Sequence, residues 1–237
     1  MRLPTTLVLI FASAAFVKPA SAAVVTLDFT GTVYDVDDRG SSSLLDGSVA
    51  TGTPFHLHVD YDESTLPSET HSSPTDASSR WIFAVPPNQV SFSVGNYLAL
   101  AGPLGGDPAN PDGFVVDLGD GSAGQPDAYA VLGNGPVTGG SGALQATFRV
   151  SLYDSTGTAV ASTQLASVPF DLASWDPWSA NGSWSVGQII ISDDPRSGEA
   201  AVTGRIESIA VSRVPEPFAG LLAAAALAAL AAVRTLV

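Results

Sequence analysis

The sequence contains no cysteine among its 237 residues. This absence excludes a disulfide scaffold, a thiolate nucleophile, a cysteine-ligated zinc site and a lipid-modified N-terminal cysteine. A chain without these devices depends on its hydrophobic core, or on bound ions, for stability. The hydrophobic fraction of 45% is high enough for such a core to form.

Basic residues are few and acidic residues are many. Three of the nine basic residues (Arg2, Lys18 and Arg234) and one of the 23 acidic residues (Glu216) lie outside residues 24–214. That central part therefore has six arginines, no lysine, 22 acidic residues and a formal net charge of −16. Such a negative field repels phosphate backbones, which excludes nucleic acid as a partner. It suits solubility outside the cytoplasm and the binding of divalent cations.

The central part also lacks a helical pattern, because no window of it carries the apolar stripe of an amphipathic helix. Apolar and polar residues alternate along many short segments, and 23 glycines and 17 prolines mark frequent turns. About nine to eleven short strands predict an all-β fold over residues 24–213, an antiparallel two-sheet β-sandwich of jelly-roll type. The alternation predicts a buried set formed by Phe29, Phe55, Leu57, Val59, Phe92, Phe148 and Val150. It places His56 and His58 on the solvent side.

Residues 1–23 have the order of parts of a secretory signal peptide. Arg2 precedes an apolar run over residues 7–17, and an Ala-Ser-Ala site ends at Ala22. This order predicts a signal helix, cleavage after Ala22 or one residue later, and export by the general secretory route. The alternative is a buried N-terminal helix, which the strand pattern that begins at once afterwards disfavours.

The chain closes, over residues 214–237, with Val214-Pro215-Glu216-Pro217, an alanine- and leucine-rich run and Arg234. The apolar run over residues 218–233 would span about 24 Å as a helix. We expect it to form a transmembrane helix with Arg234 at the cytoplasmic face. The two prolines are expected to end the last strand and to leave Glu216 accessible to a processing enzyme.

The Pro-Glu-Pro triplet, the apolar segment after it, the terminal basic residue and the paired signal peptide resemble the PEP-CTERM sorting signal of Gram-negative bacteria. The resemblance implies recognition by an exosortase, a membrane peptidase that acts near the triplet and passes its substrate to the cell surface or its polysaccharide matrix. The central part resembles a recurrent ectodomain pattern of such proteins through Phe29-Thr-Gly-Thr-Val33, Gly52-Thr-Pro-Phe55, Val59-Asp-Tyr-Asp62 and Gly204-Arg-Ile-Glu-Ser-Ile209. That pattern implies a fold type and carries no assigned activity.

His56 and His58 are candidate metal ligands, because residues two apart share one face of a strand. Asp60 and Asp62 continue that face. With a third ligand from a neighbouring strand, such a row could hold zinc or another transition metal. The alternative is that these residues are only the solvent-facing half of an alternating strand. His71 is the one other histidine of the chain.

Clustered carboxylates beside glycines are candidate calcium ligands, since calcium takes about six to eight oxygens. The candidates are Asp35, Asp37 and Asp38 in one group, and Asp112, Asp117 and Asp120 in another. Neither group has the spacing of the EF-hand loop, and acidic turns that keep the chain soluble are the alternative. If the central part of the chain, residues 24–214 (called the body below), binds a cofactor, the sequence favours calcium.

Three of the four tryptophans lie close together, at Trp175, Trp178 and Trp184. Aromatic faces stack on sugar rings, so an exposed cluster here predicts a polysaccharide-binding surface. The alternative is that the three side chains plug one end of the β-fold.

The chain is poor in groups for catalysis. Its three histidines lie near one strand and the loop after it, and it has no Gly-x-Ser-x-Gly segment. Acidic residues are plentiful, but nothing selects a pair for glycoside hydrolysis. We therefore predict that the protein is not an enzyme.

Together these features predict an exported protein of the cell surface or extracellular matrix, with a structural or presentational role among exopolysaccharides. The alternative is a carbohydrate-binding β-sandwich that is calcium-dependent or not. The expected partners are an exosortase-type peptidase, the inner membrane in transit and polysaccharide.

Overall fold

The computed structural model describes residues 23–38, 44–73, 76–83, 87–101, 114–121, 125–139, 144–177, 186–192 and 199–215. These residues form eleven β-strands and two short 3₁₀ helices, and they contain no α-helix. In chain order the elements are β1 (Ala23–Asp38), β2 (Pro54–Asp62), β3 (Glu69–Ser72), β4 (Asp76–Phe83), β5 (Gln89–Val94), β6 (Tyr97–Ala101), β7 (Phe114–Gly121), β8 (Asp127–Thr138), β9 (Leu144–Asp154), η1 (Leu165–Ser167), η2 (Leu172–Ser174), β10 (Val186–Ser192) and β11 (Glu199–Pro215).

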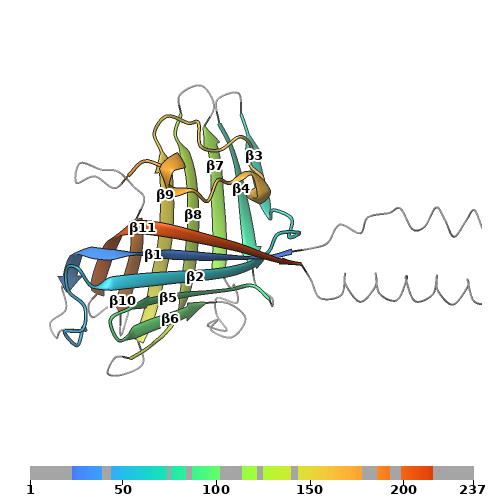
Figure 1. The fold of residues 1–237 in the computed structure, drawn as a ribbon. Coiled ribbons are helices and arrows are strands. Elements are labelled where there is room, and N and C mark those ends of the chain that lie inside the picture. Colours follow the sequence, from blue (N-terminus) through green and yellow to red (C-terminus); the bar gives the residue numbers. More distant parts are fainter. Residues whose placement is uncertain are drawn as a thin grey trace, which may run out of the picture.

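Eight of these strands close into an antiparallel barrel. Around the ring they follow the order β8, β6, β5, β2, β1, β11, β10 and β9, and the pairing of β9 with β8 completes it. Figure 1 shows β8 and β9 upright, with β1, β2 and β11 running across them. The predicted two-sheet sandwich is therefore wrong. Alternation within a strand identifies the buried face, but it is the same whether the outer strands remain sheet edges or pair with each other.

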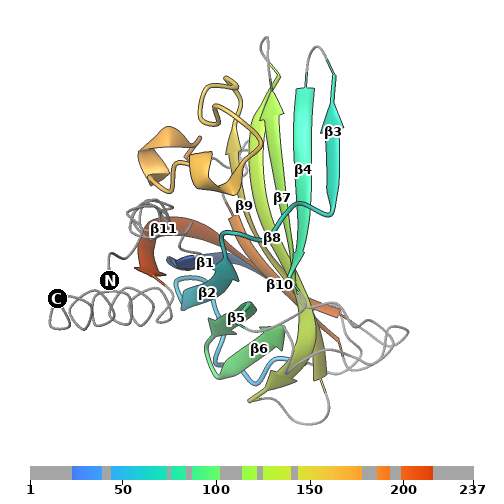
Figure 2. The same ribbon diagram turned by 90° about the vertical axis from the view of Figure 1, so that its right-hand side faces the viewer.

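The remaining three strands extend outward from β8. One edge of β8 is shared, because residues 128–133 pair with β7 while Val137 and Thr138 pair with β6. Beyond β7 lie β4 and then β3, which is the outermost strand (Figure 2). β3 has four residues, all of them exposed. A short polar strand of this kind protects a sheet edge from pairing with other chains.

The core predicted from the alternation is confirmed. Phe29, Phe55, Leu57, Val59, Phe92, Phe148 and Val150 are each at most 3% exposed. Each such side chain contributes about 1.5–3 kcal/mol to the stability of the fold when fully buried. On the outward side of β2, His56 is exposed as predicted, whereas His58 is half-buried.

β1 and β11 are the longest strands, with 16 and 17 residues, and they pair along their length. The pairing runs from Asp38 opposite Ala200 to Ala23 opposite Pro215, with two register shifts on the way. β11 reaches Pro215, the first of the two prolines, and the residues after it lie outside the described part of the chain.

The fold class is also corrected in a second respect, because the described residues do not include the two flanking helices that the sequence predicts. The part of the chain that the structure describes has no helix long and apolar enough to cross a membrane. Its first and last residues instead belong to strands, and they pair with each other in the β1–β11 ladder. The signal helix is predicted over residues 1–23 and the transmembrane helix over residues 218–233, and apart from Ala23 these residues lie outside the described part of the chain.

Candidate metal centre

Two histidines and an aspartate lie together on the outward face of β1 and β2. His56 and His58 are two residues apart on β2 and therefore point to the same side of the strand. Asp28 lies directly opposite His58 on β1. The register of these two strands thus brings three side chains with ligand atoms to one place.

Asp28 contacts both imidazoles through the same oxygen. Its Oδ1 lies 2.8 Å from Nε2 of His56 and 2.8 Å from Nδ1 of His58. The three ligand atoms all lie within 4.8 Å of one another. Among the described residues, this is the one group of three His, Cys, Asp or Glu side chains close enough together to hold an ion.

A second carboxylate, that of Asp60, fixes the orientation of His58. Asp60 Oδ2 lies 3.1 Å from Nε2 of His58. Asp60 is itself held in place, because Thr26 donates to Oδ1 over 2.6 Å and Gln89 donates to Oδ2 over 2.8 Å. His58 therefore directs one ring nitrogen to Asp60 and the other to Asp28. A hydrogen bond to the second nitrogen is the usual way in which a metal-binding imidazole is oriented.

These contacts also shift the pKa values of the cluster. Burial alone would lower the pKa of His58, but the hydrogen bonds to Asp28 and Asp60 outweigh it, so the pKa is raised. Burial would raise the pKa of Asp28, but hydrogen bonds from His58 and His56 outweigh it, so the pKa is lowered. The pKa of Asp60 is likewise lowered by its hydrogen-bond donors against the effect of burial. Both carboxylates therefore carry the negative charge that a bound cation requires.

The cluster is open to solvent. The side chains of His56, Asp28 and His58 are 46%, 35% and 31% exposed. Three protein ligands with an open fourth position is the pattern of zinc sites that bind water or a further ligand. The arrangement can therefore hold a divalent ion whose remaining coordination positions face solvent.

The sequence pattern found two of these three side chains. His56 and His58 were candidates because of their spacing, and a third ligand was expected from a neighbouring strand without being identified. That ligand is Asp28, which belongs to the polar side of β1. Alternation marked this side as polar, but the residue opposite His58 depends on the register of β1 against β2, which alternation does not fix.

Two other residues of the histidine hypothesis lie elsewhere. Asp62 Oδ1 accepts hydrogen bonds from the backbone and hydroxyl of Ser64, at 2.8 and 2.7 Å, and so anchors the turn after β2. His71 is on β3, exposed, with Nε2 3.7 Å from a carboxylate oxygen of Asp76. Neither residue belongs to the group of Asp28, His56 and His58, which is called the Asp28 cluster below.

The first group of predicted calcium ligands lies along the last part of β1. Asp35 and Asp37 fall on one side of the strand and Asp38 on the other. Asp38 accepts weak hydrogen bonds from the backbone of Leu44 and Leu45, both at 3.4 Å. The alternation of β1 therefore separates carboxylates that are adjacent in the sequence.

The second group includes Asp117 and Asp120 on β7, whereas Asp112 lies outside the described residues. Asp117 is engaged by Arg80, whose guanidinium donates to both carboxylate oxygens at 2.7 and 3.0 Å. The pKa of Asp120 is raised by burial and by the nearby charge of Asp127. The structure does not bring this group together with the first one, and calcium binding stays a prediction.

The tryptophan cluster is described only at Trp175. This side chain is 4% exposed, and its Nε1 donates to the backbone oxygen of Pro169 over 2.8 Å. Trp175 therefore offers no open face to a sugar ring. Trp178 and Trp184 lie outside the described residues.

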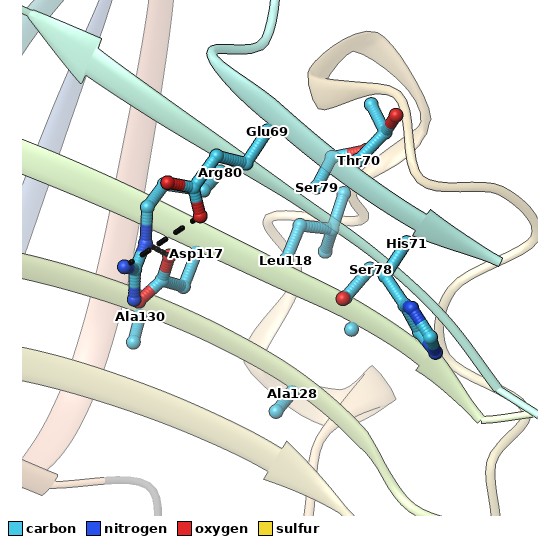
Figure 3. Close-up of a pocket in the computed structure, with 11 residues that line it drawn as sticks. Glu69, Thr70, His71, Ser78, Ser79, Arg80, Asp117, Leu118, Ala128 and Ala130 are labelled. Atoms are coloured by element: carbon cyan, nitrogen blue, oxygen red, sulfur yellow. Dashed lines mark hydrogen bonds and ion pairs between the residues drawn. The ribbon is translucent and has the colours of Figure 1, made fainter.

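A groove of about 370 Å³ runs along β3, β4, β7 and β8. Figure 3 shows Arg80 between Glu69 and Asp117 on one side of it and His71 on the other. The charge of Arg80 is already paired with two carboxylates, and His71 is the single ring among the lining residues. The groove thus lacks both a free cation for an anionic ligand and an aromatic platform for a sugar.

The Asp28 cluster is accordingly the described feature with the most defined chemistry. Its three ligand atoms and its orienting carboxylate come from two paired strands. No family model, curated protein or solved structure matches this chain.

Proposed function

We propose that this chain is an exported protein of the cell surface or extracellular matrix of a Gram-negative bacterium, with a structural or presentational role. It is delivered by the N-terminal signal peptide and sorted by an exosortase-type peptidase that acts at Val214-Pro215-Glu216-Pro217. Its environment is the exopolysaccharide that such sorting systems serve. The body itself carries out no catalysis in this proposal.

One observation carries the proposal, the pairing of Ala23 with Pro215 at the end of the β1–β11 ladder. Ala23 is the residue that follows the predicted cleavage site, and Pro215 belongs to the sorting motif. The described strand pairings reach both of these residues, from Ala23 at the start of β1 to Pro215 at the end of β11. A peptidase that removes the segments before Ala23 and after the Pro-Glu-Pro triplet therefore leaves all of these pairings in place.

The charge of the body supports the same proposal. Its formal net charge of −16 over residues 24–214 keeps it soluble once released, and attracts the divalent cations of an anionic polysaccharide matrix. The carbohydrate-binding alternative gains no support from the described part, where Trp175 is buried and the groove lacks a sugar-stacking ring. We therefore propose the presentational role alone.

The proposal is tested by Glu216→Ala in the native host, with fractionation into inner membrane and cell surface. The expected result is loss of the protein from the surface fraction and its accumulation in the inner-membrane fraction. Glu207→Ala is the matched control, because Glu207 is an exposed acidic residue of β11 outside the motif. Surface delivery of Glu216→Ala at the wild-type level would overturn the proposal.

A further inference from the structure

The Asp28 cluster is more ordered than the polar, solvent-facing side of a strand needs to be. Alternation explains why His56 and His58 face outward, but not why both imidazoles converge on one oxygen of Asp28, each at 2.8 Å. We propose that Asp28, His56 and His58 form a binding site for a divalent transition-metal ion of the zinc type. This inference does not depend on the sorting proposal.

The distances suit such an ion. Zinc binds imidazole nitrogen and carboxylate oxygen at about 2.0–2.2 Å in a tetrahedral arrangement, which places neighbouring ligand atoms about 3.3 Å apart. The three ligand atoms already lie within 4.8 Å of one another, with 2.8 Å between Asp28 and each imidazole. To bind the ion, Asp28 Oδ1 and each imidazole nitrogen must move apart only from 2.8 Å to about 3.3 Å.

Asp60, which contacts the ligand His58 from the other side, also supports a metal site. Asp60 makes three hydrogen bonds, to His58, Thr26 and Gln89, between 2.6 and 3.1 Å. Its bond to Nε2 of His58 leaves Nδ1 as the nitrogen that faces Asp28. In metal sites, a carboxylate on the far nitrogen fixes the ring and makes it a better ligand. If His58 were only a polar residue on the outward side of β2, it would not need a carboxylate at each of its two ring nitrogens.

The ligand types select the ion. Two imidazoles and one carboxylate suit zinc, copper and nickel, whereas calcium and magnesium prefer oxygen ligands alone. The chain has no cysteine that would compete for a soft ion, and the negative charge of the body attracts cations toward it. We expect one ion per chain, with water at the coordination positions that face solvent.

The binding test uses the full chain in detergent and isothermal titration with Zn²⁺. The expected result is one site, with affinity reduced at least tenfold by His56→Ala, by His58→Ala and by Asp28→Asn. Asp60→Ala should lower the affinity by about 10- to 100-fold, because the orienting bond to His58 is lost. His71→Ala is the matched control and should bind as the wild type does, since His71 is exposed and lies on β3 outside the cluster.

A second measurement needs no variant, because the chain has three histidines in all. Imidazole ¹⁵N spectra of the wild type should show two rings shifted by one equivalent of Zn²⁺, and the third, His71, unchanged. One equivalent of Ca²⁺ should shift none of them. The proposal is overturned by the absence of Zn²⁺ binding, by equal shifts of all three rings, or by wild-type affinity in His58→Ala.

Discussion

Asp127 and Asp154 lie directly opposite each other on β8 and β9, and both carboxylates are buried. Asp127 accepts hydrogen bonds from the backbone of Gly121 and of Val160, both at 2.7 Å. Asp154 accepts three more from backbone N–H groups of the segment that follows it, residues 155–160. The pair thus fastens that segment to the ends of β7, β8 and β9.

Replacing Asp127 tests whether its two backbone hydrogen bonds stabilise the fold. Asp127→Asn should lower the free energy of unfolding by about 2–3 kcal/mol, because one of the two backbone N–H groups would face an amide NH₂ that cannot accept. Urea denaturation measures the change. Asp35→Asn is the control, since Asp35 is an exposed carboxylate of β1, and should change stability by less than about 0.5 kcal/mol. Equal effects of the two substitutions would contradict the role given to Asp127.

The acid stability of the protein should depend on Asp154. Burial would raise its pKa, but hydrogen bonds from Thr156, Thr158 and Ala159 outweigh this and lower the pKa from 3.8 to about 2. A lowered pKa in the folded state stabilises above the unfolded value, and this contribution is lost as pH falls through about 2. The stability difference between the wild type and Asp154→Asn should therefore be full at pH 5 and shrink toward pH 2. A difference that stays constant over this range in urea denaturation would refute the assignment.

The barrel closes tightly around Phe55. This ring is 3% exposed and stacks on Phe92 with 5.5 Å between centroids. A Cβ at Gly204 of β11 would overlap the ring and approach the backbone oxygen of Thr32 to 2.9 Å. Gly204→Ala should therefore destabilise the fold by about 1–3 kcal/mol, the usual effect of overpacking.

Thermal unfolding of the Gly204 variant measures this effect, with Gly119→Ala as its control. A Cβ at Gly119 would meet no atom closer than 3.9 Å, so this substitution should leave stability within about 0.5 kcal/mol of the wild type. A Gly204→Ala variant as stable as the Gly119→Ala variant would show that Phe55 is not packed as described.

Two buried tyrosine hydroxyls are expected to behave oppositely. Within the described residues, the hydroxyl of Tyr129 has no hydrogen-bond partner, whereas that of Tyr97 accepts from Asp46 N at 2.6 Å and donates to Leu44 O at 3.1 Å. Tyr129→Phe should leave the free energy of unfolding unchanged or raise it by about 1 kcal/mol, and Tyr97→Phe should lower it by about 1–2 kcal/mol. Chemical denaturation of both variants measures this. An equal loss in both would mean that Tyr129 does have a partner.

The buried faces of the strands were predictable, but the closure of the barrel was not. The run from Phe55 to Tyr61 alternates because one side of β2 faces the core, and this local signal is visible in the sequence. Closure depends on contacts between distant segments, such as Val24 with Val214 in the β1–β11 ladder. It also depends on the two neighbours that share one edge of β8. No local pattern carries this information.

In the candidate site too, the sequence revealed what depends on local spacing and not what depends on contacts between strands. His56 and His58 were found because their spacing is local, whereas Asp28 was missed because its place opposite His58 depends on strand register. The calcium hypothesis counted Asp117 as a free ligand, but Arg80 on the neighbouring strand engages it. The sugar hypothesis needed an exposed Trp175, and composition does not tell whether an aromatic side chain is buried.

The central claim is that the segments on either side of the paired Ala23 and Pro215 are removed while the body between them persists. Intact-mass analysis of the protein from the surface fraction of the native host tests this claim most directly. The predicted species begins at Ala23 or Val24, ends near the Pro-Glu-Pro triplet and lacks residues 218–237. A mature surface species that still ends at Val237 would contradict the sorting proposal.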